Sequence, residues 1–218
     1  MPDHAVIGYC HPGTVRAEFC ASLISTAMEC KTRLDTVLAL GSGPNISTAR
    51  NKIVNEFLEN HRAPWLLMVD TDMVFNGTAI DRLIAAADPV ARPIVGALCY
   101  SQNGDDEPFT TMYELTESQP GVLGFIRYTQ WPDDACVRVA ATGAAFLLMH
   151  RAALRTIQTA TADISAPWFK ETPIPSPLSM MGEDMTFCLR AAAANIPVHV
   201  YTGVQVGHMK PTMLGKVI

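Results

Sequence analysis

The sequence predicts an α/β protein with a mostly parallel, Rossmann-like central sheet and α-helices on both faces. Short apolar runs alternate with helical patterns along the first hundred residues, as βαβ units require. Residues 65–69 are apolar at every position, which suits a strand covered on both faces. With 218 residues, 49% of them hydrophobic, the chain can form one substantial core, and we expect a single domain over residues 1–218.

The first half of the chain gives the clearer pattern. Residues 5–10 read as a strand, and Thr14 can cap a helix that runs to about residue 29. A second strand is expected at 34–40, and Ser47 can cap the next helix, which ends near residue 60. The strand at 65–69, a helix near 77–87 and a strand at 93–98 follow.

The second half changes character after a polar loop at 101–108. Short strands near 109–115, 122–128 and 136–140 suggest a small antiparallel extension of the sheet. The remaining elements are expected as a buried strand at 144–149, helices at 151–159 and 183–195, and a last strand at 197–201. The proline-rich segment 160–182 has little periodicity and is typical of a mobile loop or lid.

Composition narrows the functional classes. The net charge of −5 argues weakly against a protein that binds polyanions nonspecifically. Six scattered cysteines without a Cys-x-x-Cys pair indicate reduced thiols rather than disulfides or a zinc site. The first residues lack the features of a secretion signal, and no stretch approaches the roughly 18 apolar residues of a membrane span. A cytoplasmic location is expected.

Two carboxylates stand directly after the buried strand, in Asp70-Thr71-Asp72. Open α/β sheets bind ligands at this end of their strands. Alternate positions of an extended chain point opposite ways, so one carboxylate can face a divalent ion while the other faces a neighbouring part of the ligand. An isolated motif of this kind is as often an Asp that caps a turn.

Glu183 and Asp184 open a late helix. Carboxylates in a first helical turn are favoured by the helix dipole, so a structural role competes with that of a general base. His208 follows the last strand, and a lone histidine is more often structural than a ligand. Its imidazole can nevertheless complete a metal site built from carboxylate and phosphate oxygens, a mixture that suits Mn²⁺ somewhat better than Mg²⁺.

Other candidates lie near the first two helices. Arg50 stands near a helix N-terminus, where the dipole disfavours a cation, so it needs an anionic partner such as a phosphate or Asp70. The segment Cys10-His11-Pro12 follows the first strand, where a nucleotide can dock, but the glycine-rich dinucleotide fingerprint and the P-loop pattern are both absent. Trp168 and Phe169 are expected to pin a loop to the core rather than to stack on a sugar.

Three motifs together resemble those of the GT-A glycosyltransferases. They are Ser47-Thr48-Ala49-Arg50-Asn51, Leu67-Met68-Val69-Asp70-Thr71-Asp72-Met73 and Gly182-Glu183-Asp184-Met185-Thr186-Phe187-Cys188. They look most like a compact branch found in bacteriophage and bacterial genomes, similar to family 2-like transferases and a group of mannosyltransferases. The resemblance covers about residues 5–210 and implies a metal-dependent transfer of a sugar from a nucleotide-diphosphate sugar to a hydroxyl acceptor.

The resemblance implies a role for each matching residue. Asp72 and His208 would bind Mn²⁺ or Mg²⁺, and Asp70 would contact the ribose or the metal. Asp184 or Glu183 would deprotonate the acceptor. The remaining contacts to the nucleotide sugar would come from Cys10, His11, Pro12, Arg50, Asn51, Thr71 and Gly143. Residues 1–100 would form the nucleotide-sugar-binding half, and residues 101–218 the acceptor-binding half.

Two alternatives stay open at this point. A nucleotidyltransferase also uses paired carboxylates at a strand end, although the segment 11–16 is a poor match for its glycine-rich basic loop. A catalytically silent relative would only bind a sugar or nucleotide. The acceptor can be a protein, a glycan or a hydroxylated DNA base, and the sequence leaves the oligomeric state open. If the chain is phage-encoded, the host cytoplasm is its expected location.

Overall fold

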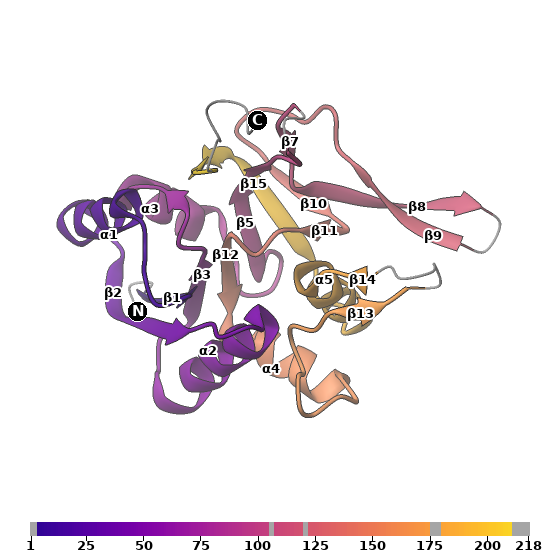
Figure 1. Cartoon of the computed structure of the whole chain (residues 1–218), viewed down its shortest axis with the longest axis horizontal. Coiled ribbons are helices and arrows are strands. Elements are labelled where there is room, and N and C mark those ends of the chain that lie inside the picture. Colours follow the sequence, from indigo (N-terminus) through magenta and orange to yellow (C-terminus); the bar gives the residue numbers. More distant parts are fainter. Residues whose placement is uncertain (1–3, 105–106, 120–121, 175–179, 211–218) are drawn as a thin grey trace, which may run out of the picture.

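The computed structural model describes residues 4–104, 107–119, 122–174 and 180–210. These residues form a seven-stranded central sheet with helices on both faces (Figure 1). Along the sheet the strand order is β10-β15-β5-β12-β3-β1-β2. The strands are β1 (His4–His11), β2 (Arg33–Gly41), β3 (Trp65–Val69), β5 (Ile94–Leu98), β10 (Cys136–Val139), β12 (Phe146–His150) and β15 (Val198–Gln205).

Five of the seven strands run in the same direction, which confirms the predicted α/β class. β1 pairs in parallel with β2 and β3, and β5 pairs in parallel with β15. β12 lies between β3 and β5 and is antiparallel to both, and β10 is antiparallel to β15, so the sheet is mixed rather than built of parallel pairs alone. A strand parallel to β5 would need a crossover connection, usually a helix, that carries the chain back across the sheet. The described elements between β5 and β12 are all strands, and the chain enters β12 directly from a separate antiparallel sheet.

Helices cover both faces of the sheet. α1 (Ala17–Glu29) and α3 (Gly77–Ala86) lie against one face, and α2 (Ile46–Asn60), α4 (Arg151–Ala160) and α5 (Glu183–Ala193) against the other (Figure 1). Because side chains alternate along β3, Leu66 and Met68 belong to the core beneath α2, α4 and α5, whereas Leu67 belongs to the core beneath α1 and α3. Every residue of β3 is buried, as its apolar run predicts.

Two predicted helix caps are wrong. α1 begins at Ala17, and no side chain caps it, so Thr14 lies outside the helix. The cap of α2 is Asn45, whose side-chain oxygen accepts a hydrogen bond from the Thr48 amide at 2.9 Å. Asn and Ser are equally good caps, and here the asparagine comes two residues earlier, which places Ser47 inside the first turn with a buried hydroxyl.

The second half adds small antiparallel sheets around the central one. β8 (Met112–Gln119), β9 (Val122–Arg127) and β11 (Ala141–Thr142) form a three-stranded sheet whose β8–β9 hairpin extends from the body in Figure 1. The strand predicted at 136–140 is β10, at the edge of the central sheet instead. Three two-stranded pairs complete the fold: β4 (Met73–Val74) with β16 (Gly207–His208), β6 (Tyr100–Ser101) with β7 (Phe109–Thr110), and β13 (Thr172–Pro173) with β14 (Met180–Met181).

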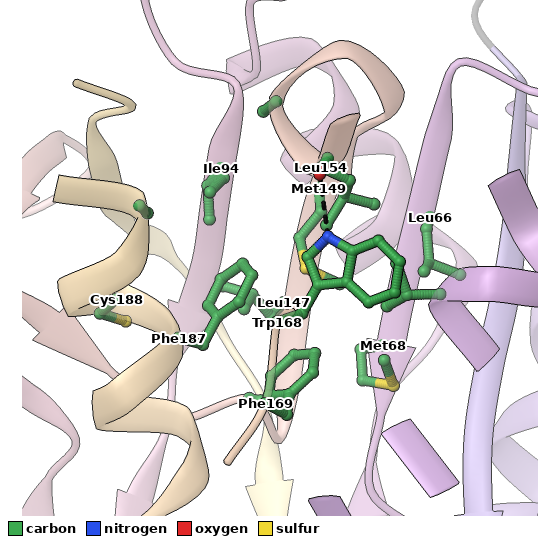
Figure 2. Packing of buried hydrophobic residues seen from close by; sticks show 14 of the residues in the cluster. Leu66, Met68, Ile94, Leu147, Met149, Leu154, Trp168, Phe169, Phe187 and Cys188 are labelled. Atoms are coloured by element: carbon green, nitrogen blue, oxygen red, sulfur yellow. Dashed lines mark hydrogen bonds between the residues drawn. The ribbon is translucent and has the colours of Figure 1, made fainter. Parts of the chain in front are cut away.

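The first part of the segment 160–182 is fixed to the core, although the sequence predicts a mobile loop there; residues 175–179 of that loop lie outside the described residues. Trp168 and Phe169 are fully buried, as expected of a pair that pins a loop. The Trp168 ring nitrogen donates to the Leu154 carbonyl at 2.8 Å, and the Phe169 ring stacks on Phe187 with centroids 4.7 Å apart (Figure 2).

Candidate functional site

An open cleft of about 710 Å³ lies where β1, β2 and β3 end. Loops that follow these three parallel strands form its walls, at the edge of the sheet where α/β proteins bind ligands. Its lining residues are Cys10, Pro12, Thr14, Val15, Arg16, Ser42, Gly43, Pro44, Asn45, Ile46, Asp70, Thr71, Asp72 and Glu171. The predicted Asp70-Thr71-Asp72 motif therefore lines a cavity and is more than part of a turn.

The structure brings Asp72 and His208 together from 136 positions apart. β4 follows Asp72 and pairs with β16, which contains His208, so the two short strands align the two side chains. The His208 Nε2 lies 2.9 Å from Asp72 Oδ2, and its Nδ1 lies 2.7 Å from the carbonyl oxygen of Tyr100. Because that carbonyl can only accept, Nδ1 carries a proton.

The charges around this pair reinforce one another. Burial opposes ionisation of Asp72, but the hydrogen bond and the charge of His208, together with Lys210 at 3.6 Å, hold the pKa of the carboxyl below its ordinary value. The hydrogen bond to Asp72 raises the pKa of His208 above its ordinary value, against the opposing effect of burial. In the metal-free protein the two groups therefore form an ion pair at mildly acidic pH.

The pair fits a divalent ion as a partial set of ligands. Among the residues that the structure describes, no three His, Cys, Asp or Glu side chains converge on one point, so the protein itself offers an oxygen and a nitrogen. Mg²⁺ in nucleotide sites is commonly held by one or two carboxylates, with water and substrate phosphates completing the shell. The hydrogen bond from Nδ1 to Tyr100 fixes the orientation of the ring, so Nε2 is the atom that would bind a metal ion.

Arg50 lies behind the cleft and joins two carboxylates. It is only 3% exposed; one terminal nitrogen donates to Asp70 Oδ1 at 2.6 Å, and the other donates to Glu183. Burial disfavours its charge, but Asp70 and Glu183 hold the pKa of Arg50 above its ordinary value. The anionic partner predicted for Arg50 is thus Asp70, with Glu183 in addition. Both terminal nitrogens of Arg50 thus donate to protein carboxylates, and a nucleotide contact for this residue stays a prediction.

Asp184 stands at the start of α5 beside Gly143. Its Oδ1 accepts a hydrogen bond from the Met185 amide at 2.8 Å, and a Cβ placed on Gly143 would lie 3.6 Å from Oδ2. Burial raises the pKa of this carboxyl above its ordinary value, and the neighbouring charge of Glu183 adds to the effect. A carboxyl whose pKa is perturbed in this way is a candidate functional group.

The other predicted residues fall into two groups. Cys10, Pro12 and Thr71 line the cleft, and burial raises the pKa of the Cys10 thiol to about 11. His11 is not among the lining residues; its Nδ1 accepts a hydrogen bond from the Gly13 amide at 3.1 Å. Asn51 is not among the lining residues either; it is buried, and its side-chain amide bonds to backbone groups of the protein, so a nucleotide contact from it stays a prediction.

Several polar residues of the cleft were not foreseen as site residues, among them two in βα loops and one in a long loop. Arg16 precedes α1, Asn45 caps α2, and Glu171 follows the pinned pair Trp168 and Phe169. Arg16 and Asn45 each follow a strand of the parallel set and precede a helix, so their position in a βα loop was a usable signal. Glu171 offered no such signal, because its place depends on how the loop docks.

Comparison with known proteins supports the fold. No protein-family model matches the chain, and no curated protein sequence matches it either. Among solved structures, A197 from STIV superposes with a TM-score of 0.56 at 14% identity, over 95% of this chain and 86% of that one. GalNAc-T7, whose structure was determined with UDP, GalNAc and Mn²⁺, gives a TM-score of 0.58 at 10% identity over 94% of this chain. This chain covers 43% of that protein's length. Both relatives have the GT-A fold, and this chain shares it.

Proposed function

We propose that this protein is a metal-dependent glycosyltransferase that moves a sugar from a nucleotide-diphosphate sugar to a hydroxyl acceptor. One observation carries the proposal: Asp72 and His208 meet beside a cleft at the carboxyl ends of β1, β2 and β3. Support comes from the GT-A fold and from a solved structure of that fold that holds UDP, GalNAc and Mn²⁺.

Asp72 and His208 would hold a Mn²⁺ or Mg²⁺ ion. The ion would supply electrostatic stabilisation of the negative charge that develops on the departing diphosphate. Lys210, 3.6 Å from Asp72, adds a second positive charge at the same end of the cleft. Arg16, Asn45 and Thr71 line the cleft and would bind the nucleotide with guanidinium, amide and hydroxyl groups.

The first turn of α5 would supply the proton acceptor for the attacking hydroxyl. Glu183 and Asp184 both lie there, and Gly143 lies next to Asp184. General-base removal of a proton contributes about 10²–10⁴-fold to a reaction of this kind. The acceptor would enter from the side of Gly143 and Thr111, which line the approach to Asp184 Oδ2. Protein, glycan and hydroxylated DNA base all remain acceptor classes under this proposal.

The described residues contain no helix long and apolar enough to cross a membrane.

Thermal unfolding with a panel of nucleoside diphosphates and nucleotide sugars, with and without Mn²⁺, tests the donor half. We expect one nucleoside diphosphate to raise the melting temperature only when Mn²⁺ is present. At a ligand concentration 100 times Kd the gain corresponds to about 2.7 kcal/mol. Asp72→Ala and His208→Ala should each abolish the Mn²⁺-dependent part of the shift.

The protein contains a matched control pair. His4 and Asp35 form a second His–Asp pair with partly exposed side chains, at the end of β1 that lies away from the cleft; His4 Nδ1 lies 2.6 Å from Asp35 Oδ2. His4→Ala and Asp35→Ala should leave the Mn²⁺-dependent shift unchanged. The proposal is wrong if no nucleotide shifts the protein, or if the shift survives in the Asp72 and His208 variants. Binding of a nucleotide sugar without turnover of any acceptor or water would instead indicate a catalytically silent relative.

A further inference from the structure

Arg50 occupies a junction of three elements. It belongs to α2, Asp70 follows β3, and Glu183 opens α5. The arginine side chain is 3% exposed, whereas those of Asp70 and Glu183 are 29% and 15% exposed, so the cation is the more deeply buried group. Its Nε has no hydrogen-bond partner among the described residues. A buried charge of this kind is costly unless it is well paired, and here two carboxylates provide the pairing.

Arg50 therefore lies beside a group of three carboxylates. Asp70 and Glu183 each accept a hydrogen bond from a terminal nitrogen of Arg50. Asp184 has no ion pair with Arg50; its Oδ1 accepts from the Met185 amide, and its Oδ2 lies next to Gly143. Of the two neighbouring carboxylates of α5, Glu183 is thus paired with Arg50 and Asp184 is not.

We propose that Arg50 is a positioning residue: by holding Glu183 and Asp70 it fixes the start of α5 against the end of β3 and leaves Asp184 as the carboxylate that accepts the substrate proton. This inference rests on the proposed glycosyl transfer, because it assigns roles within that site. It makes Glu183 an anchor rather than the base.

The charges that act on Asp184 come from each element beside it. Burial is the largest influence and raises its pKa; Glu183 from its own helix and Asp70 from the end of β3 raise it further, and Arg50 from α2 lowers it. Gly143 and Thr111, on the remaining side, are uncharged. Removing Arg50 leaves two uncompensated carboxylates next to Asp184, so its pKa should rise. Removing the charge of Glu183 should have the opposite effect.

Carbon-13 NMR of the carboxyl groups can follow the titration of Asp184 directly, without a substrate. The protein is labelled at Asp and Glu carboxyls and kept in a chelator, and Asp184→Asn identifies the resonance. We expect the midpoint of Asp184 to move to higher pH in Arg50→Met and to lower pH in Glu183→Gln. If the two opposite changes are additive they should largely cancel in the double variant, and any departure from their sum measures the coupling between Arg50 and Glu183.

Arg151 offers a matched control. It is a partly buried arginine at the start of α4, and its guanidinium donates to backbone carbonyls of Leu58 and Ala63 rather than to the site. Arg151→Met removes comparable packing and should leave the midpoint of Asp184 where it is. If Arg50→Met does not fold, Glu183→Gln tests the same coupling in a protein that keeps the arginine.

The inference is overturned if the Asp184 midpoint is the same in wild type and Glu183→Gln, or if Arg50→Met and Arg151→Met shift it equally. This outcome is separate from failure of the proposed function. A protein that binds no nucleotide but shows the expected midpoints would refute the transferase proposal and keep the Arg50 coupling. A protein that binds a nucleotide with Mn²⁺ but shows unchanged midpoints would keep the transferase proposal and refute the Arg50 coupling.

Discussion

Replacing Asn51 by alanine should destabilise the protein strongly, because this amide holds the loop at Trp168 and Phe169 to α2. Its Nδ2 donates to the carbonyls of Ser47 and Phe169, both at 2.7 Å. Its Oδ1 accepts from the backbone amides of Trp168 and Phe169, at 3.2 and 3.3 Å. In Asn51→Ala both buried N–H groups lose their acceptor, and each such group costs about 1–3 kcal/mol.

We therefore expect Asn51→Ala to lower the free energy of unfolding by about 3 kcal/mol, since the loop can relax and recover part of the loss. For a protein of this size, that loss corresponds to a fall of about 6–12 °C in melting temperature. Urea unfolding followed by tryptophan fluorescence measures the change. The control is Asn55→Ala, one turn further along α2 at an exposed position. If the two variants unfold within about 0.5 kcal/mol of each other, the amide does not hold the loop.

Three further predictions concern separate parts of the molecule. The pKa of Asp184 in the folded protein is raised above its ordinary value of 3.8, so ionisation of this carboxyl lowers the free energy of unfolding as the pH rises above 3.8. Asp184→Asn should therefore increase the free energy of unfolding at pH 7, and the gain should vanish toward pH 3.8; equal stability at pH 7 would contradict this. Gly8→Ala would place a Cβ 2.5 Å from Ile53 Cγ2 and should cost about 1–3 kcal/mol in urea unfolding, whereas Gly41→Ala, with no atom within 4 Å, should cost much less. Burial raises the pKa of the Cys188 thiol to about 12, so mass spectrometry should find it unlabelled by a maleimide at pH 7 until the protein unfolds.

Local patterns were sufficient to predict the framework of the site. The fully apolar run at 65–69 identified a buried strand, and the position of Asp72 just after it placed this carboxylate at the ligand edge of the sheet. A shared role for Asp72 and His208 came instead from the resemblance to known glycosyltransferases, and in the structure Nε2 of His208 lies 2.9 Å from Oδ2 of Asp72.

Long-range contacts were not predictable in the same way. Glu183 lies 133 positions from Arg50, and nothing in either local pattern distinguishes an ion pair with this residue from a contact with phosphate. Asn51 followed Arg50 in a motif that resembles a donor site, yet its amide satisfies the backbone 117 and 118 positions away. The direction of β12 was also hidden, because a buried strand has the same apolar pattern whichever way it runs.

The interior place of β12 has a consequence for how the protein is made. β3 and β5 are synthesised early, but β12 must fit between them, so until residue 150 leaves the ribosome both strands have an unfilled edge with unpaired backbone groups. The sheet is thus completed from within rather than by addition at its margin. His208 emerges later still, and the contact between Asp72 and His208 forms only when nearly all of the described chain has been translated. A nascent chain stalled before β15 emerges carries Asp72 on an incomplete sheet with unpaired strand edges, and species of this kind are prone to aggregation.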